Sequence, residues 1–161
     1  MIEVKINNEK AVLDTLNKIV QQTENRRRLM RAIAGTMLTA VDMNFRDGGH
    51  PAWLPVKSRP GGTPLKNKGN FRKSMRRYSD NDSAMAGTNV EYAAIHHFGG
   101  QTRPHVIKPV FKKALVFGGV VRKSVKHPGS RIPARPFLTL TAQDEQNILR
   151  EVKGYFERLI K

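Results

Sequence analysis

The sequence predicts an α+β protein in which helices pack on a small, mainly antiparallel sheet, with two long Pro/Gly-rich loop excursions. Apolar residues recur at helical spacing near both ends of the chain, and short apolar runs separated by turn residues fill the middle. Glycines and prolines cluster in the excursions, 47–69 and 101–131. A length of 161 residues fits a single domain, which we expect to span 1–161.

One strand and two helices are expected before the first excursion. Apolar and charged residues alternate over 2–6, which is the period of a strand, and Asn7 or Asn8 is suited to cap the next helix. That helix has the apolar stripe Val12, Leu13, Leu16, Ile19 and Val20, which is expected to supply part of the core. A longer helix is predicted over 24–46, with the stripe Leu29, Met30, Ile33, Met37, Leu38, Val41 and Phe45.

The middle of the chain predicts short elements. A short helix is expected over 69–77, and two short strands over 78–88 around an Asp-Asn-Asp turn. The segment 92–98 predicts a helix that ends at Gly99-Gly100. Trp53, the single tryptophan, lies in the first excursion and is expected to pin that loop to the body of the protein or to a neighbouring subunit.

The second excursion, 101–131, is predicted to be the least regular part of the chain. Two apolar pairs flank Gly118-Gly119, which predicts a hairpin whose second strand carries Arg122, Lys123 and Lys126. The prolines that follow, at 133 and 136, favour an extended path. The last helix is expected to begin at Thr141, which forms a variant of the capping box with Asp144.

The charge of the chain points to polyanionic partners. The formal net charge is +16, and residues 91–140 carry nine Lys and Arg residues but one acidic residue. Such a field attracts DNA, RNA, an anionic surface or an acidic protein, and does not define a fold. Arg26, Arg27 and Arg28 cluster at a helix start, where cations oppose the helix dipole and call for an acidic neighbour or partner; a solvated face is the alternative.

The sequence offers no recognisable catalytic, cofactor or metal site. It has no cysteine, no GxSxG, no HExxH and no P-loop or dinucleotide fingerprint. Adjacent His96 and His97 would point about 100° apart on a helix, which does not suit a shared ion. We therefore expect a non-enzymatic protein without a cofactor, and no membrane partner, because neither a signal peptide nor a spanning segment is present. Assembly in the cytoplasm is expected.

Three motifs, in chain order, carry a resemblance to a known family. The first is Pro51-Ala52-Trp53-Leu54-Pro55 followed by Gly69-Asn70-Phe71-Arg72-Lys73-Ser74, with Phe71 where a leucine is expected. The second runs from Tyr92 through His96 and Phe98 to Gly99-Gly100, and the third is Ile132-Pro133-Ala134-Arg135-Pro136-Phe137-Leu138. Together they resemble the phage virion morphogenesis family of Mu-like and related contractile-tailed phages, over nearly the whole chain.

The resemblance implies a structural virion protein that acts in tail completion or head–tail joining. A ring at the neck, six-fold to match a contractile tail, is expected, with contacts to neighbouring neck, tail-terminator or head-connector proteins. The candidate interface or motif residues are Trp53, Phe71, Tyr92, His96, Phe98, Gly99, Arg135, Pro136 and Phe137. Tyr92, Ile95 and Phe98 are expected to pack, and the first two motifs to meet around Trp53 and Tyr92.

The basic residues leave a second function open. Arg26, Arg27, Arg28, Arg122, Lys123 and Lys126 are candidate polyanion contacts. A nonspecific DNA-binding protein associated with packaging or capsid assembly is therefore the alternative, and duplex in the lumen of a ring is a candidate ligand. Six copies would carry roughly 100 formal positive charges against about 24 phosphates in 40 Å of duplex, so contacts with acidic proteins should matter at least as much. Arg135, held between prolines, suits a carboxylate or phosphate partner, or an internal acidic residue.

Overall fold

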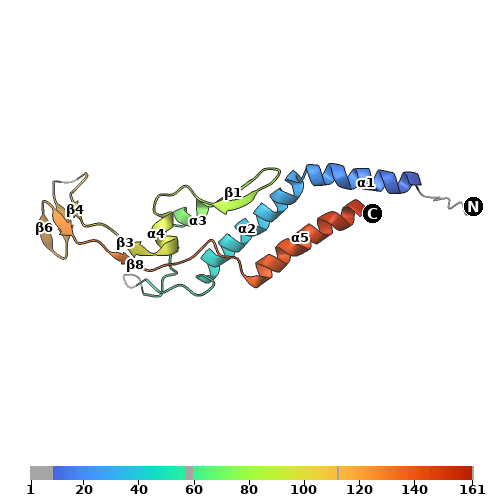
Figure 1. Cartoon of the computed structure of the whole chain (residues 1–161). Coiled ribbons are helices and arrows are strands. Elements are labelled where there is room, and N and C mark those ends of the chain that lie inside the picture. The colour runs from blue at the N-terminus through green and yellow to red at the C-terminus, as the bar shows by residue number, and fades with distance from the viewer. Residues whose placement is uncertain (1–8, 57–59, 112, 161) are drawn as a thin grey trace, which may run out of the picture. The chain divides into compact units, whose positions relative to one another are not determined.

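The computed structural model describes residues 9–56, 60–111 and 113–160 (Figure 1). The strand predicted over 2–6 and the caps predicted at Asn7 or Asn8 lie outside these ranges. Contacts divide the chain into two compact units. We call the unit made of 1–90 and 137–161 the body, and the unit 91–136 the arm. The prediction of a single domain over 1–161 stays a prediction.

Three helices build the body. α1 spans Glu9–Glu24, α2 spans Arg27–Asp47 and α5 spans Ala142–Ile160. The helix predicted over 24–46 begins three residues later, at Arg27. Before it, the backbone N–H of Arg26 donates to the Asn81 side chain at 2.8 Å. The helices share an apolar core, which consists of Leu29, Tyr155 and Leu159 with Ile19, Met30, Ile33 and Val152 packed against it.

A short helix and a hairpin complete the body. α3 spans Asn70–Lys73, and β1 (Arg76–Ser79) pairs antiparallel with β2 (Ala84–Gly87), both in contact with α2. The Asp80 carboxylate closes the hairpin by accepting hydrogen bonds from two backbone N–H groups of the turn, at 2.8 and 2.7 Å. The predicted hairpin is confirmed, whereas the helix predicted over 69–77 is shorter because its last residues join β1.

The start of α5 confirms the predicted capping box. The Asp144 carboxylate accepts a hydrogen bond from the backbone N–H of Thr141 at 2.9 Å, and the Thr141 hydroxyl accepts one from the N–H of Asp144 at 3.2 Å. Each side chain thus satisfies a backbone donor that a helix start leaves without a partner.

The arm consists of α4 (Ala93–Phe98) and nested strand pairs (Figure 1). β3 (Gly100–Gln101) pairs with β8 (Arg131–Ile132), β4 (His105–Ile107) with β7 (Val125–His127), and β5 (Leu115–Phe117) with β6 (Val120–Arg122), all antiparallel. The chain therefore runs through β3, β4 and β5, turns at Gly118-Gly119, and returns through β6, β7 and β8, their partners in reverse order.

This nesting corrects two expectations and confirms two. The segment predicted to be least regular is a succession of paired strands. Of the three basic residues expected on the second hairpin strand, Arg122 lies on β6, Lys123 follows β6, and Lys126 lies on β7. The hairpin at Gly118-Gly119 and the end of α4 at Gly99 are confirmed. The α+β class is confirmed too; the described strands form two-stranded antiparallel ladders rather than one continuous sheet.

Candidate functional site

Residues of the first and third motifs meet in the body core. The Phe45 ring of α2 lies 5.7 Å from the Trp53 ring, 5.5 Å from Phe71 and 5.6 Å from Phe137, measured between centroids. The rings of Phe71 and Phe137 lie 5.1 Å apart, edge to face, an arrangement that aromatic pairs favour. All four side chains are buried, so these motif residues serve the core of the chain.

Trp53 pins the first excursion to the body, one of the two roles expected for it. Its indole ring covers Gly49, where an added Cβ would lie 2.2 Å from the indole nitrogen. Its backbone N–H donates to the carbonyl of Gly48 at 2.7 Å. A glycine is needed at position 49 both for this contact and for a φ of +96°.

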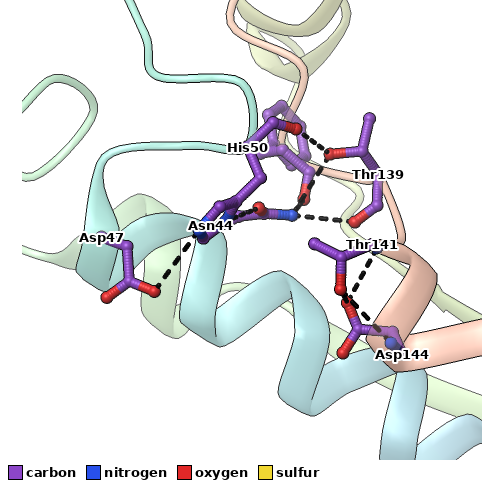
Figure 2. Close-up of polar contacts among 7 residues, drawn as sticks. Asn44, Asp47, His50, Thr139, Thr141 and Asp144 are labelled. Atoms are coloured by element: carbon purple, nitrogen blue, oxygen red, sulfur yellow. Dashed lines mark hydrogen bonds and ion pairs between the residues drawn. The ribbon is translucent and has the colours of Figure 1, made fainter. Parts of the chain in front are cut away.

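A polar cluster ties the third motif to the end of α2 (Figure 2). The buried Asn44 amide donates to the carbonyl of Thr139 at 2.9 Å and to that of Phe137 at 3.2 Å. Its oxygen lies 3.0 Å from Nδ1 of His50, so Nδ1 must carry the proton. The Thr139 hydroxyl donates to the backbone oxygen of His50 at 3.3 Å. The cluster satisfies buried polar groups and fixes the segment that leads into α5.

The contacts of His50 do not form a nucleophile–base pair. Within the described residues its ring contacts the Asn44 amide oxygen and lies 3.8 Å from the Asp47 carboxylate, and no hydroxyl group is bonded to it. The described ranges also hold no group of three or more His, Cys, Asp or Glu side chains arranged for a metal ion. Across the same ranges, none of the helices combines the length and apolar character of a bilayer span.

The second and third motifs meet at the base of the arm. The backbone N–H of Arg135 donates to the carbonyl of His96 at 2.8 Å, and Gly100 lies opposite Ile132 in the β3–β8 ladder. Gly99 has a φ of +73°, and a Cβ there would lie 2.7 Å from the backbone nitrogen of Ala134. Glycine is therefore the one residue type at position 99 that allows the two strands to approach so closely.

A buried charged side chain lies where the second and third motifs meet. The Arg135 side chain is 6% exposed, and burial lowers the pKa of its guanidinium. Burial, and then the nearby Arg135 charge, lower the pKa of His96 below its ordinary value, and burial lowers that of His97. The neutral form of both imidazoles is favoured as a result. Pro136 ends the arm beside Arg135, where its fixed φ favours an extended path.

Two aromatic residues of the second motif face solvent. Phe98 is 77% exposed, and its ring lies 4.6 Å from that of His97. The Tyr92 ring lies 5.8 Å from that of His96 and is half exposed. Phe98, expected to be a packing residue, is therefore not covered by the described chain, and its place in an interface stays a prediction. A contact between Trp53 and Tyr92, which would join body to arm, stays a prediction.

The candidate polyanion contacts differ in their surroundings. Arg26 forms an ion pair with Asp82 at the turn of the β1–β2 hairpin, which supplies the acidic neighbour that the helix start required. Arg27 and Arg28 are exposed, and Arg28 lines an open groove of about 620 Å³ between α2 and α5, together with Arg150, Glu151 and Arg158. In the arm, Arg122, Lys123 and Lys126 are all exposed.

The sequence did not predict two exposed apolar surfaces. Val12, Leu13, Leu16 and Val20 of α1, expected to be buried, are each 51–53% exposed. In the arm, Val110 is 83% and Phe111 is 99% exposed. The signal for the second surface was present in the sequence, because this apolar pair stands between lysines in a segment without acidic residues. Contiguous exposed apolar surface marks interaction sites.

Sequence comparisons match the chain over its whole length. Residues 7–157 match the phage virion morphogenesis family. The chain is 44% identical over 161 residues to the Mu-like prophage FluMu G protein 2 of Haemophilus influenzae, and the match covers all of both chains. No solved structure matches the chain.

The family match and the relative place the chain in a class of structural proteins of phage virion morphogenesis. The chain belongs to the phage virion morphogenesis family, as the three motifs indicated.

Proposed function

We propose that this protein is a structural component of the neck or tail-completion region, where copies form a ring that joins or finishes the head–tail interface. In this proposal the protein acts as a structural part of the particle rather than as an enzyme, which its membership of a virion morphogenesis family supports. Family membership supports a role in building the virion. The exposed apolar stripe on α1 is the observation that supports assembly from several copies.

Charge makes this stripe suitable for a second copy of the chain. Copies with a net charge of +16 repel one another, so they must meet where charges balance. α1 carries two Lys and three acidic residues, and α5 carries three Lys or Arg and four acidic residues. Both helices also expose apolar side chains, including Leu16 of α1 and Leu149 of α5. Six copies would match a contractile tail.

Sedimentation of the purified chain tests the self-contact. We expect Leu16→Asp to lower the fraction of protein in oligomers at least tenfold, because the change places a charge in the apolar contact. Lys18→Gln is the matched control, since it alters the charge of the same helix by the same amount at an exposed polar position. Equal oligomer fractions for wild type and Leu16→Asp would contradict the assignment of α1.

The place in the virion is tested by electron microscopy of a lysate in which this gene carries an early stop codon. DNA-filled heads beside separate tails are the expected result. Heads empty of DNA would move the protein to packaging or head assembly. Normal infectious particles would show that the virion does not need it.

One observation favours the alternative of nonspecific DNA binding: the arm carries nine Lys or Arg residues and Glu91 as its one acidic residue. Binding of a 30-base-pair duplex to the purified chain should then weaken steeply with added salt, because phosphate contacts release counterions. Duplex binding by a monomer at about 50 mM salt that is largely lost at about 200 mM salt would favour this alternative over a ring.

A further inference from the structure

We propose that the tip of the arm is a docking element that inserts into an apolar depression rimmed by carboxylates on a neighbouring virion protein. The arm tip is Val110, Phe111, Lys113 and the β5–β6 hairpin with Lys123. This inference rests on the proposed structural role in the virion, and it names the surface and the chemistry of the partner.

The apolar side chains of the arm tip are not covered by the described chain. Phe111 is 99% and Val110 is 83% exposed, and both lie just before β5 in the sequence. Val116 and Val121 lie opposite each other in the β5–β6 register, so they share one face of the ladder, and both are about two-thirds exposed. A free protein gains nothing by exposing these side chains, whereas burying them in a partner is favourable.

The charges of the arm tip define the rim of the partner. Lys113, Arg122 and Lys123 are exposed around the apolar side chains, and residues 92–136 contain no acidic residue that could pair with them. A partner that buries Phe111 must therefore bring carboxylates to these cations. Opposite charges at the edge of an interface also speed association and set the orientation of the partners.

The backbone favours a protein over a membrane. Among the described residues, β5 and β6 pair with each other alone, so each strand keeps an outer edge beside which the described chain places no strand. A lipid interior leaves the N–H and C=O groups of such an edge unsatisfied, at a cost of several kcal/mol each. A protein partner offers backbone or polar side chains to these edges, as in strand addition.

The apolar residues favour a protein over DNA. Phosphate contacts require the lysines and arginines alone, and β-branched Val110, Val116 and Val121 have no role beside a phosphate backbone. A protein depression uses both kinds of side chain. DNA and anionic membranes are therefore outcomes that the test must distinguish from the proposed partner.

Cosedimentation with virion parts tests the docking surface. Heads and tails are separated from the lysate of the early-stop phage, and the purified full-length chain is added to each. We expect Phe111→Ser, combined with Lys113→Glu and Lys123→Glu, to lower the bound amount at least tenfold. The matched control combines Met85→Ser with Lys66→Glu and Lys68→Glu, which makes similar changes at exposed body positions and should bind as wild type.

The outcomes separate docking from the place of the protein in the virion. Unchanged binding of the arm-tip variant, with native circular dichroism, would overturn the proposal. So would flotation of the wild type, but not the variant, with phosphatidylglycerol vesicles, or loss of wild-type binding after DNase treatment of the heads. If the early-stop lysate contains joined particles, the neck role fails, while arm-tip-dependent binding to either part would still establish docking.

Discussion

The body and the arm are stabilised in different ways. The buried hydrophobic side chains of the described chain all belong to the body, while in the described part of the arm the one buried side chain is that of Arg135. The body carries twenty Lys or Arg and twelve acidic residues, the arm nine and one. The body is thus held by apolar burial, and the arm by strand pairing and a close approach at Gly99. This difference supports the proposal that the body supplies stability and the arm supplies partner contact.

The largest effect is expected in the aromatic core of the body. Phe45→Ala removes the ring that contacts Trp53, Phe71 and Phe137, and should lower the free energy of unfolding by about 3–5 kcal/mol. Urea denaturation followed by circular dichroism measures the change. The arm substitution Val116→Ala, at an exposed position, should stay within about 0.5 kcal/mol. Similar losses of unfolding free energy in the two variants would contradict the difference between body and arm.

The anchor of the arm should be nearly as sensitive, but locally. Gly99→Ala places a Cβ against the backbone of Ala134 and should destabilise the arm base by about 1–3 kcal/mol. Gly119→Ala is the matched control, because Gly119 has a φ of +75° against +73° and open space around it. Hydrogen exchange of the arm amides should rise far more for Gly99→Ala. Equal protection in the two variants would show that the close approach at 99 does not anchor the arm.

Acidification should loosen the arm base before the body. Burial and Arg135 lower the folded-state pKa of His96 below its ordinary 6.5. As pH falls, His96 is protonated more readily in the unfolded chain than in the folded chain. The stability that neutral His96 contributes is therefore complete above pH 6.5 and is lost as pH falls through that value. The protection factor of the Arg135 amide should drop from pH 7.5 to 5.5 by the equivalent of up to about 1 kcal/mol. His96→Gln should remove most of this dependence, and an unchanged drop in that variant would assign it to other histidines.

A smaller effect is expected from an ion pair of the body. The Asp42 carboxylate accepts hydrogen bonds from Arg72 at 2.5 and 2.9 Å, which lower its pKa, and Arg46 contributes. A depressed pKa stabilises the fold above the ordinary value of 3.8, and the contribution is lost as pH falls below it. Asp42→Asn should cost roughly 0.5–1 kcal/mol at pH 7 and much less at pH 3 in urea titrations. An equal loss at both pH values would point to a packing effect rather than to charge. Asp14→Asn, at an exposed position of α1, is the control.

The sequence predicted the local elements well, because their signals are local. The capping box at Thr141, the turn at Asp80 and the glycine stop at Gly99 each depend on residues within a few positions. Pairing between distant strands was missed in the arm, because short runs such as 105–107 carry little alternation and no turn signal joins them to 125–127.

The surfaces were harder to predict than the elements. An amphipathic helix has the same pattern whether its stripe is buried in the chain or in a neighbour, so α1 was read as core. The convergence of Trp53, Phe71 and Phe137 on Phe45 depends on the tertiary path of two loops, which no spacing in the sequence encodes.

The most direct test of the account supplies variants in trans to the early-stop phage and counts particles by electron microscopy. Wild-type protein should restore joined virions. The arm-tip variant should leave DNA-filled heads beside separate tails. The purified variant should form the same oligomers as wild type, because the proposal places self-contact on the body and docking on the arm. Joined virions in wild-type numbers with the arm-tip variant would contradict the division of labour between the two regions.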